Sequence, residues 1–404
     1  MPDIIQAQQL SPKIFNVNKD NYQNTPIFFG QQNGLFDSIN KRYPALWTLY
    51  KDLKKNDWEE NELSFLSCNV EFKTCDHNTS DMMILQLGWQ WSTDSVAARS
   101  VIGILSHSIA SSEIWAGYCQ ITANENVHAL TYSEIVRMSF DNPDEVIKRV
   151  LSVKESQNRL QLVTDVFDKT LEMNLDYSRG VLPYSQELYE QNFMFLVALY
   201  TMERLQFMAS FAITFAICKS GLFQPIGLMV QKIAKDEYEY HAPYGAGVIK
   251  AELNTPRGQL AFKNNRAKIL ALLNAVTQGE FDWADYSFSE GRTLPGMTAE
   301  KVKNWVRFNA RAVYTFFGLD KESSHELIDY NPLIFMADWI NIDNNQQSPQ
   351  EMANNNYKVN TVNKQTTTKV FAFDRPGNRK LEAITAVVEV APPVLTEEQV
   401  VVPL

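Results

Sequence analysis

The sequence predicts an all-α protein, a bundle of long helices with carboxylate and imidazole side chains in its interior. Apolar residues recur at helical period from about residue 37 to about residue 335, in stretches longer than an average helix. Strand signals are weak, and no glycine-rich phosphate-binding loop occurs. Several acidic residues and histidines also stand on helix faces that should be apolar, which points to chemistry inside the bundle.

Composition and charge exclude several classes of protein. The chain has 404 residues, with 47 Asp and Glu against 37 Lys and Arg, so its formal net charge of −10 disfavours nucleic-acid binding. The longest nearly uncharged apolar run, 207–218, is too short for a bilayer, which requires about 20 residues. The N-terminus lacks an export signal, and the four cysteines are too sparse for a disulfide framework. We therefore expect a cytoplasmic protein with no nucleic-acid or membrane partner.

The domain organisation follows from the same patterns. Residues 36–340 are predicted to form one helical domain, preceded by an N-terminal extension over 1–35. From residue 341 the composition turns polar and turn-rich, so 341–404 is predicted to be a flexible tail, ending in the apolar and acidic LTEEQVVVPL. The helices are expected near 36–54, 60–74, 80–108, 111–140, 143–174, 184–219, 224–252, 257–288 and 298–318.

Two of these helices carry acidic and histidine residues in the first half of the chain. Over 80–108, Asp94 lies between apolar residues at helical spacing. Over 111–140, Glu125, His128 and Tyr132 follow one another in steps of three and four and share one helix face. Glu125 and His128 could hold one metal ion together, although this motif alone also fits a satisfied buried pair or a solvated face.

Two later helices complete the pattern. The stretch 184–219 is apolar almost all round, and Glu203 lies in its middle, where an isolated carboxylate would cost several kcal/mol unless it bound a cation. Its neighbour Arg204 points in another direction. Glu237 and His241 share a face of the stretch 224–252.

Together these residues match the pattern of a carboxylate-bridged di-metal bundle. Such bundles take one acidic residue from each of two helices and a Glu–His pair from each of the other two. The chain has only five histidines, and two of them fall at the required places. We therefore predict a ferritin-like di-metal carboxylate bundle with extra helices, binding oxidised iron or manganese. The predicted metal ligands are Asp94, Glu125, His128, Glu203, Glu237 and His241.

With these residues the sequence resembles the radical-generating small (beta) subunit of class I ribonucleotide reductase. The resemblance extends over most of the chain, and its segments occur in the family's order. They are Pro26–Gln31 (PIFFGQ), Asp94–Ser100, Asn124–His128 followed by Tyr132, Glu203 with Phe207 and Phe211, Ile233–Glu237, Asp282–Tyr286 and Asn331–Pro332.

The resemblance implies an activity and a set of functional residues. It implies two metal ions per chain, iron in the first place with manganese as the alternative, and a stable radical on Tyr132. The radical equivalent would pass through Asp236, Trp58 and Tyr357 to a separate large (alpha) subunit, which reduces ribonucleoside diphosphates to deoxyribonucleotides for DNA synthesis. It further implies a homodimer and a tail, 341–404, that binds the large subunit.

The sequence departs from the family in the spacing of Glu237 and His241. The family has two residues between this Glu and His, whereas this chain has three, so a strict alignment would put Tyr240 in the ligand position. An i→i+5 turn absorbs one extra residue, and Pro243 is incompatible with a regular helix there. We therefore predict a distorted helix over about 236–244, with His241 at the metal and Tyr240 pointing away.

Other interpretations stay open from the sequence alone. A ferritin-like di-iron oxidase or oxygenase acting on a small apolar substrate would use the same ligands, but it would not need Tyr132, Trp58 and Tyr357 together. A metal-free helical scaffold would have no reason to bury Glu203. Trp58 could be an ordinary core residue, and Trp47 competes with it for the electron-transfer role.

Overall fold

Long helices make up almost the whole of the computed structural model, which describes residue 16 and residues 24–340. No strand forms within these residues, where the only extended pairings are two isolated bridges, Phe28 to Ile109 and Leu294 to Met297. The predicted all-α class is confirmed. The elements are α2 (Pro44–Lys55), α3 (Leu66–Thr74), α4 (His77–Leu105), α5 (Ser112–Ser139), α6 (Pro143–Ser152), α7 (Lys154–Ser178), α8 (Gln186–Thr201), the π-helix η1 (Met202–Gln206), α9 (Met208–Lys219), α10 (Gln224–Asp236), the π-helix η2 (Glu237–His241), α11 (Ala242–Leu253), α12 (Pro256–Ser287), α13 (Ala299–Phe316), the 3₁₀-helix η3 (Asp320–Glu322) and α14 (Met336–Ile340).

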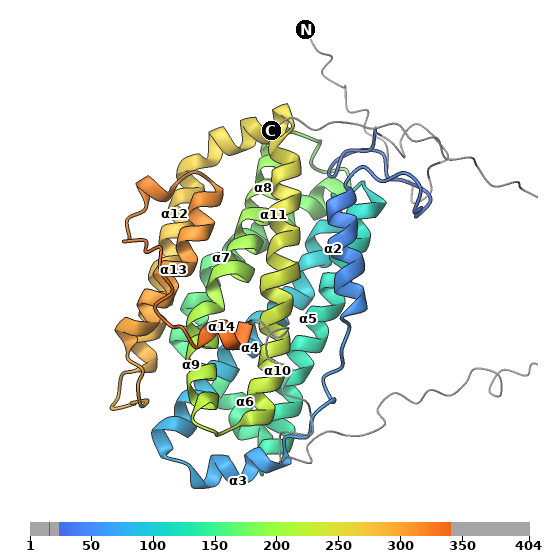
Figure 1. The fold of residues 1–404 in the computed structure, drawn as a ribbon. Coiled ribbons are helices and arrows are strands. Elements are labelled where there is room, and N and C mark those ends of the chain that lie inside the picture. The colour runs from blue at the N-terminus through green and yellow to red at the C-terminus, as the bar shows by residue number, and fades with distance from the viewer. Residues whose placement is uncertain (1–15, 17–23, 341–404) are drawn as a thin grey trace, which may run out of the picture. The chain divides into compact units, whose positions relative to one another are not determined.

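Four long rods form the centre of the bundle (Figure 1). They are α4, α5, the continuous run α8–η1–α9 and the continuous run α10–η2–α11. Helix α4 packs on α5 and α9, and α10 packs on the same two helices, which closes a ring of four. The run α8–η1–α9 is buried on nearly every side, as its all-round apolar sequence predicts.

The remaining long helices cover this centre. Helix α2 packs on α5 and α11, and α7 packs on α4, α8 and α12. Helix α12 also packs on α8, and α13 packs on α9 and α12. In Figure 1, α12 and α13 lie on one side of the central rods and α2 on the other. Every central rod therefore packs against at least one helix of a second layer.

Serine, threonine and aspartate caps fix where several of these helices begin. The Asp76 carboxylate accepts a hydrogen bond from Thr79 N–H at 3.2 Å at the start of α4. The Ser185 hydroxyl accepts one from Leu188 N–H at 3.1 Å at the start of α8. Each cap satisfies a backbone donor that the first turn of a helix leaves unpaired.

The first helix begins later than the sequence predicts, at Pro44 rather than at residue 36. The Asp37 carboxylate accepts hydrogen bonds from the Ile39 and Asn40 N–H groups, each at 2.7 Å, so the chain forms a turn there. Pro44 then occupies the first helical turn, where its missing N–H costs nothing.

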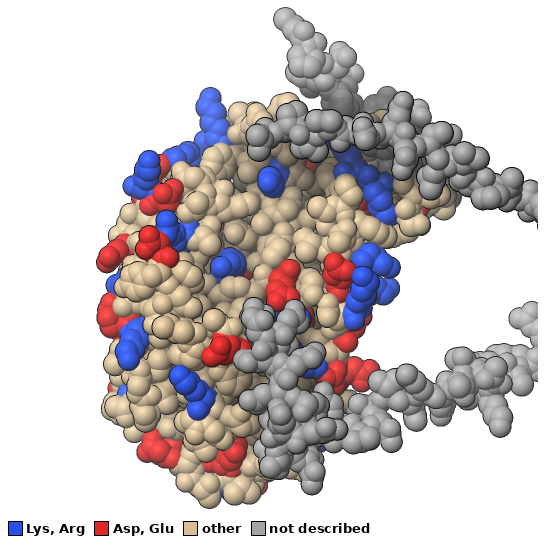
Figure 2. Space-filling model, viewed as in Figure 1, with Lys and Arg blue, Asp and Glu red and all other residues tan. Residues whose placement is uncertain are grey.

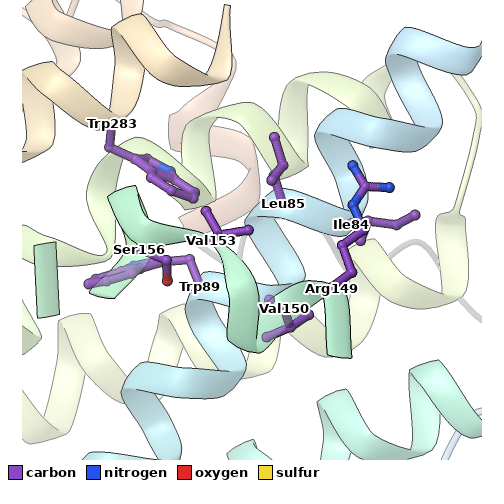
Figure 3. Close-up of a pocket in the computed structure, with 9 residues that line it drawn as sticks. Ile84, Leu85, Trp89, Arg149, Val150, Val153, Ser156 and Trp283 are labelled. Atoms are coloured by element: carbon purple, nitrogen blue, oxygen red, sulfur yellow. The ribbon is translucent and has the colours of Figure 1, made fainter. Parts of the chain in front are cut away.

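The stretch 143–174, predicted as one helix, is divided between α6 and α7 at Val153. Val153 has an extended backbone (ψ 103°), which turns the chain between the two helices. Its side chain and that of Val150 line a small cavity with Leu85 and Trp89 of α4 (Figure 3). The chain therefore breaks between α6 and α7 where it packs against α4, and helical periodicity alone does not predict this break.

Residues before position 36 also belong to the packed body. Ile27 and Phe28 are each 1% exposed, and Ala110 N–H donates to the Ile27 carbonyl at 2.8 Å. The exact division into an extension, a domain and a tail stays a prediction.

None of the helices in the described part of the chain is long and apolar enough to cross a membrane. On the face drawn in Figure 2, Lys and Arg side chains are scattered among Asp, Glu and uncharged residues.

Candidate metal centre

All six predicted metal ligands are buried, each with no more than 2% of its surface exposed. Asp94 comes from α4, Glu125 and His128 from α5, Glu203 from η1, and the last two from η2. One ligand atom from each of four of these residues lies within 4.8 Å of the others, a spacing that suits a shared metal ion. The four are Glu125, His128, Glu237 and His241.

Short contacts join each imidazole to a carboxylate of its own rod and to one of the opposite rod. His241 Nδ1 lies 2.9 Å from Glu125 Oε1 and 3.1 Å from Glu237 Oε2. His128 Nδ1 lies 3.1 Å from Glu237 Oε1 and 3.7 Å from Glu125 Oε2. The two imidazole rings lie 5.5 Å apart, nearly parallel. The α5 pair and the η2 pair therefore face each other across one small polar site.

Many of the polar atoms in this site lack a hydrogen-bond partner, even though they are buried. They include both carboxylate oxygens of Asp94, Glu125 and Glu203, together with Glu237 Oε1 and His128 Nδ1. Buried polar atoms in proteins almost always have a partner, and leaving each unpaired costs about 1–3 kcal/mol. The carboxylate oxygens outnumber the few imidazole nitrogens that could donate to them, and such a set fits metal cations, which carry no protons and bind carboxylate oxygen and imidazole nitrogen.

The electrostatics of the four carboxylates lead to the same conclusion. Burial raises the pKa of Asp94 well above its usual value, and the charge of Glu125 adds to the effect. Burial likewise raises the pKa of Glu237 and that of Glu203, the latter to about 7. Burial also opposes ionisation of Glu125, but His128 and His241 outweigh it and lower the pKa of this carboxyl to about 2. A pair of cations would favour the ionised form of all four.

A hydrogen-bonded chain links the site to Trp58. His128 Nε2 lies 3.1 Å from Asp236 Oδ2, and Trp58 Nε1–H donates to the same oxygen at 2.8 Å. Asp236 can accept the Nε2 proton, which leaves His128 Nδ1 with a lone pair toward the carboxylates. The Trp58 ring also stacks on His128, with centroids 5.6 Å apart. Trp47, the competing tryptophan, is half-buried and packs on Tyr50 instead.

Tyr132 is fully buried, and its hydroxyl has no hydrogen-bond partner. Burial raises its pKa well above the usual value of 10, and the charges of Asp94, Glu237 and Glu125 raise it further. Tyr132 therefore lies within electrostatic reach of the carboxylates as a neutral phenol. Three apolar residues in the segments that resemble the family are also fully buried; these are Phe207, Phe211 and Ile233.

The predicted helix distortion is confirmed. Residues Glu237–His241 form the π-helix η2, which leads directly into α11 and Pro243. The Tyr240 hydroxyl accepts a hydrogen bond from Asn56 Nδ2 at 2.6 Å, outside the carboxylate cluster. His241, and not Tyr240, therefore joins the polar site.

A second π-helix, η1, was not predicted, and it carries Glu203. Arg204 Nη1 donates to Asn309 Oδ1 of α13 at 2.8 Å, and the Tyr238 hydroxyl donates to the same oxygen. Asn309 Nδ2 in turn donates to the Trp305 carbonyl at 2.8 Å, which orients the amide. Asn309 therefore ties the two π-helices together through residues adjacent to Glu203 and Glu237. In the sequence, the sign of this role is that a polar residue, Asn309, occupies the apolar face of the helix over 299–316.

Tyr357 and the tail 341–404 lie outside the described residues, so the structure places neither of them.

Comparison with known proteins decides the family. A family model described as "Ribonucleotide reductase, small chain" matches residues 36–332, which is most of the chain. The chain belongs to this family. It is 21% identical over 367 residues to the ribonucleoside-diphosphate reductase 1 subunit beta of Escherichia coli O157:H7, a match that covers 88% of this chain and 96% of the relative.

Solved structures of the small-chain family share this fold. The ribonucleotide reductase R2 subunit from Clostridium botulinum superposes with a TM-score of 0.70 at 16% identity, covering 82% of this chain and 98% of that one. The dimanganese(II) protein NrdF of Streptococcus sanguinis superposes with a TM-score of 0.60 at 15% identity, covering 76% and 99%. The ferritin-like helical architecture predicted from the ligand pattern is confirmed.

Proposed function

We propose that this chain is the radical-generating small subunit of a ribonucleoside-diphosphate reductase. Family membership and the curated relatives support the reaction class. The observation that carries the site assignment is the buried set of unpaired carboxylate and imidazole atoms beside Tyr132. The cytoplasmic location expected from the sequence fits an enzyme that supplies deoxyribonucleotides.

The metal ligands in this proposal are the six buried residues of the site. Four carboxylates and two imidazoles suit two ions of iron or manganese, and we propose iron in the first place. A manganese centre is the alternative, and one solved structure with this fold is described as dimanganese(II). When bound, the two ions supply the electrons that reduce dioxygen and the oxidising power that removes an electron from a nearby tyrosine. The ligands are Asp94, Glu125, His128, Glu203, Glu237 and His241.

Tyr132 is the residue proposed to hold the radical. Loss of one electron to the oxidising metal centre and of one proton would convert its phenol to a neutral phenoxyl radical, so the ring itself would carry no charge. Full burial keeps water and reductants away from the ring, which favours a long lifetime. No hydrogen bond to the hydroxyl has to be broken when the proton leaves.

The chain His128–Asp236–Trp58 is proposed as the route between the site and the large subunit. Its hydrogen bonds and the stacking of Trp58 on His128 make a continuous path for an electron. From Trp58 the equivalent would continue through Tyr357. We further propose that the tail 341–404 binds the large subunit, and that two copies of this chain form a homodimer.

Nucleotide reduction is the direct test of this function. In the presence of a dithiol reductant, the chain, loaded with Fe(II) and exposed to oxygen, should convert a ribonucleoside diphosphate to its deoxy form only when the large subunit from the same organism is added. Omission of iron is the matched control, with a Mn(II)-loaded sample beside it to decide between the metals. Failure with both metals would contradict the proposal. The alternative, an oxidase or oxygenase of a small apolar molecule, is not favoured by the family.

A further inference from the structure

A second buried charged pair lies outside the metal site. Arg159 of α7 is 2% exposed and Glu280 of α12 is fully buried. Arg159 Nε donates to Glu280 Oε1 at 2.6 Å. Burying two charges carries a large desolvation cost, so a buried pair is weak support for stability and calls for a specific reason.

All the other hydrogen bonds of this pair go to one short segment of the neighbouring rod. Arg159 Nη2 donates to the Gln206 carbonyl, and Nη1 donates to the Ser210 hydroxyl at 3.1 Å. Glu280 Oε2 accepts from the Ala209 N–H at 3.2 Å. Gln206 Nε2 returns a hydrogen bond to the Arg159 carbonyl at 2.8 Å. The pair therefore grips residues 206–210, where η1 ends and α9 begins.

This junction is where a helix needs outside partners. A π-helix bonds residue i to i+5, so the backbone ladder shifts by one residue where it returns to the α pattern. Buried backbone groups at such a shift need side-chain or water partners. The regular α bond is present again from Phe211 N–H to the Phe207 carbonyl, at 2.9 Å. Arg159 and Glu280 bind a carbonyl and an N–H on either side of Phe207.

The direction of Glu203 depends on the same turn. Glu203 lies three residues before Gln206 within η1, and neither of its carboxylate oxygens has a hydrogen bond that fixes it. If η1 became a regular α-helix, the residues before it would shift by one position relative to α9. Such a shift would rotate Glu203 by about 100° around the helix axis relative to α9. The backbone conformation of η1 therefore sets the direction from which this carboxylate enters the site.

We propose that the Arg159–Glu280 pair positions a residue of the metal centre. The pair keeps η1 in its π-helical conformation, so that Glu203 faces the other ligands. The inference rests on the proposed function in one respect, that Glu203 is a metal ligand.

A purely structural role for the pair is the competing explanation. The Arg159 guanidinium lies 3.8 Å from the ring centroid of Trp89 and 5.0 Å from that of Trp283, and both indoles line the cavity in Figure 3. The pair could thus simply complete the core. The two roles differ in their effect on metal affinity, because a core role changes stability alone.

The test compares Mn(II) binding in three proteins. The variant is Arg159→Met with Glu280→Gln, which removes both charges at similar volume. The matched control is Glu252→Gln. This substitution removes the charge of another buried carboxylate that pairs with an arginine, Arg257. Glu252 bonds to Tyr189, near the start of α8 and far along the rod from Glu203. Free Mn(II) is counted by electron paramagnetic resonance during titration, and circular dichroism gives the melting temperature.

The wild type should bind two Mn(II) ions, and the double variant should bind them at least tenfold more weakly, since residues behind metal ligands typically affect affinity 10–100-fold. The Glu252→Gln control should lose stability but keep wild-type affinity. Adding Glu203→Ala should weaken binding clearly in the wild type and much less in the double variant, because Glu203 is already misplaced there. If the double variant does not fold, Arg159→Lys, which keeps the charge with fewer donors, decides by the same measurements.

This inference is wrong if the folded Arg159→Met/Glu280→Gln protein binds Mn(II) with wild-type affinity. The same holds for Arg159→Lys where that variant decides. Either result would leave the proposed function standing. A wild type that binds neither Mn(II) nor Fe(II) would overturn both.

Discussion

Tyr132 differs from the other buried tyrosines of the bundle in its electrostatic surroundings. Three carboxylates of the site act on its phenol, and burial adds to their effect on its pKa. Tyr118 is also buried with an unpaired hydroxyl, but only Glu203 acts on it. The sequence predicted the place of Tyr132 because one helix face carries Glu125, His128 and the tyrosine in regular steps. Whether the Tyr132 hydroxyl has a hydrogen-bond partner depends on side chains from neighbouring helices, so the residues on its own helix face could not predict it.

Tyr132→Phe should abolish the radical without disturbing the site. The change removes a hydroxyl that has no partner, so no buried group loses a hydrogen bond and stability should change by less than about 1 kcal/mol. Metal analysis should still find two ions per chain, while the phenoxyl signal and nucleotide reduction disappear. Tyr118→Phe, on the same helix, is the control and should keep both. Nucleotide reduction by Tyr132→Phe at the wild-type rate would refute the assignment.

Trp58→Phe should separate radical formation from radical transfer. The substitution keeps an aromatic ring but removes the donor to Asp236, so we expect a loss of about 1–3 kcal/mol in stability. The metal content and the Tyr132 radical should persist, while nucleotide reduction with the large subunit is lost. Trp47→Phe, outside the chain of hydrogen bonds, should leave activity unchanged. Full activity in Trp58→Phe would remove Trp58 from the route.

At the scale of the elements, the two π-helices show what the sequence could and could not reveal. The distortion in η2 was predictable because His241 stands one residue too far from Glu237 and Pro243 follows. In η1 there is one proposed ligand, Glu203, so the sequence holds no second ligand in that helix from which an irregular spacing could be measured. Its partners come from helices distant in sequence, and helical periodicity identifies buried faces without identifying which buried groups meet.

Asn309→Leu should loosen both π-helices at once. It removes the one oxygen that accepts from Arg204 and from Tyr238, so two donors lose a partner and stability should fall by about 2 kcal/mol or more. Mn(II) affinity should fall about tenfold. Asn309→Asp keeps an acceptor oxygen and should bind Mn(II) more nearly as the wild type does. Urea unfolding and Mn(II) titration measure the two effects, and equal affinity in Asn309→Leu and the wild type would contradict this role.

At the scale of the whole molecule, periodicity located the long helices but not the packing between them. The break at Val153 and the burial of Phe28, which pairs with Ile109 between α4 and α5, both depend on surfaces that only the folded chain creates. The four helices that carry the proposed ligands were nonetheless recognisable, because a carboxylate on an apolar helix face is rare enough to demand a partner.

The tail gives a prediction for the assembly with the large subunit. Its end, 390–404, combines acidic residues with an apolar cluster, a composition that can order on binding a groove of another protein. Deleting 390–404 should leave metal content and the Tyr132 radical unchanged but abolish nucleotide reduction. A synthetic peptide of these residues should inhibit the full-length chain by competing for the large subunit. Undiminished activity of the truncated chain would disprove this contact.

The most direct test of the central claim, a di-metal site that oxidises Tyr132, is low-temperature electron paramagnetic resonance after Fe(II) and oxygen are added. The sample should contain protein labelled with ring-deuterated tyrosine beside unlabelled protein, with iron counted in both. We expect about two irons per chain and a radical signal whose hyperfine structure narrows in the labelled protein. A chain that binds no iron, or a signal that tyrosine labelling leaves unchanged, would contradict the claim.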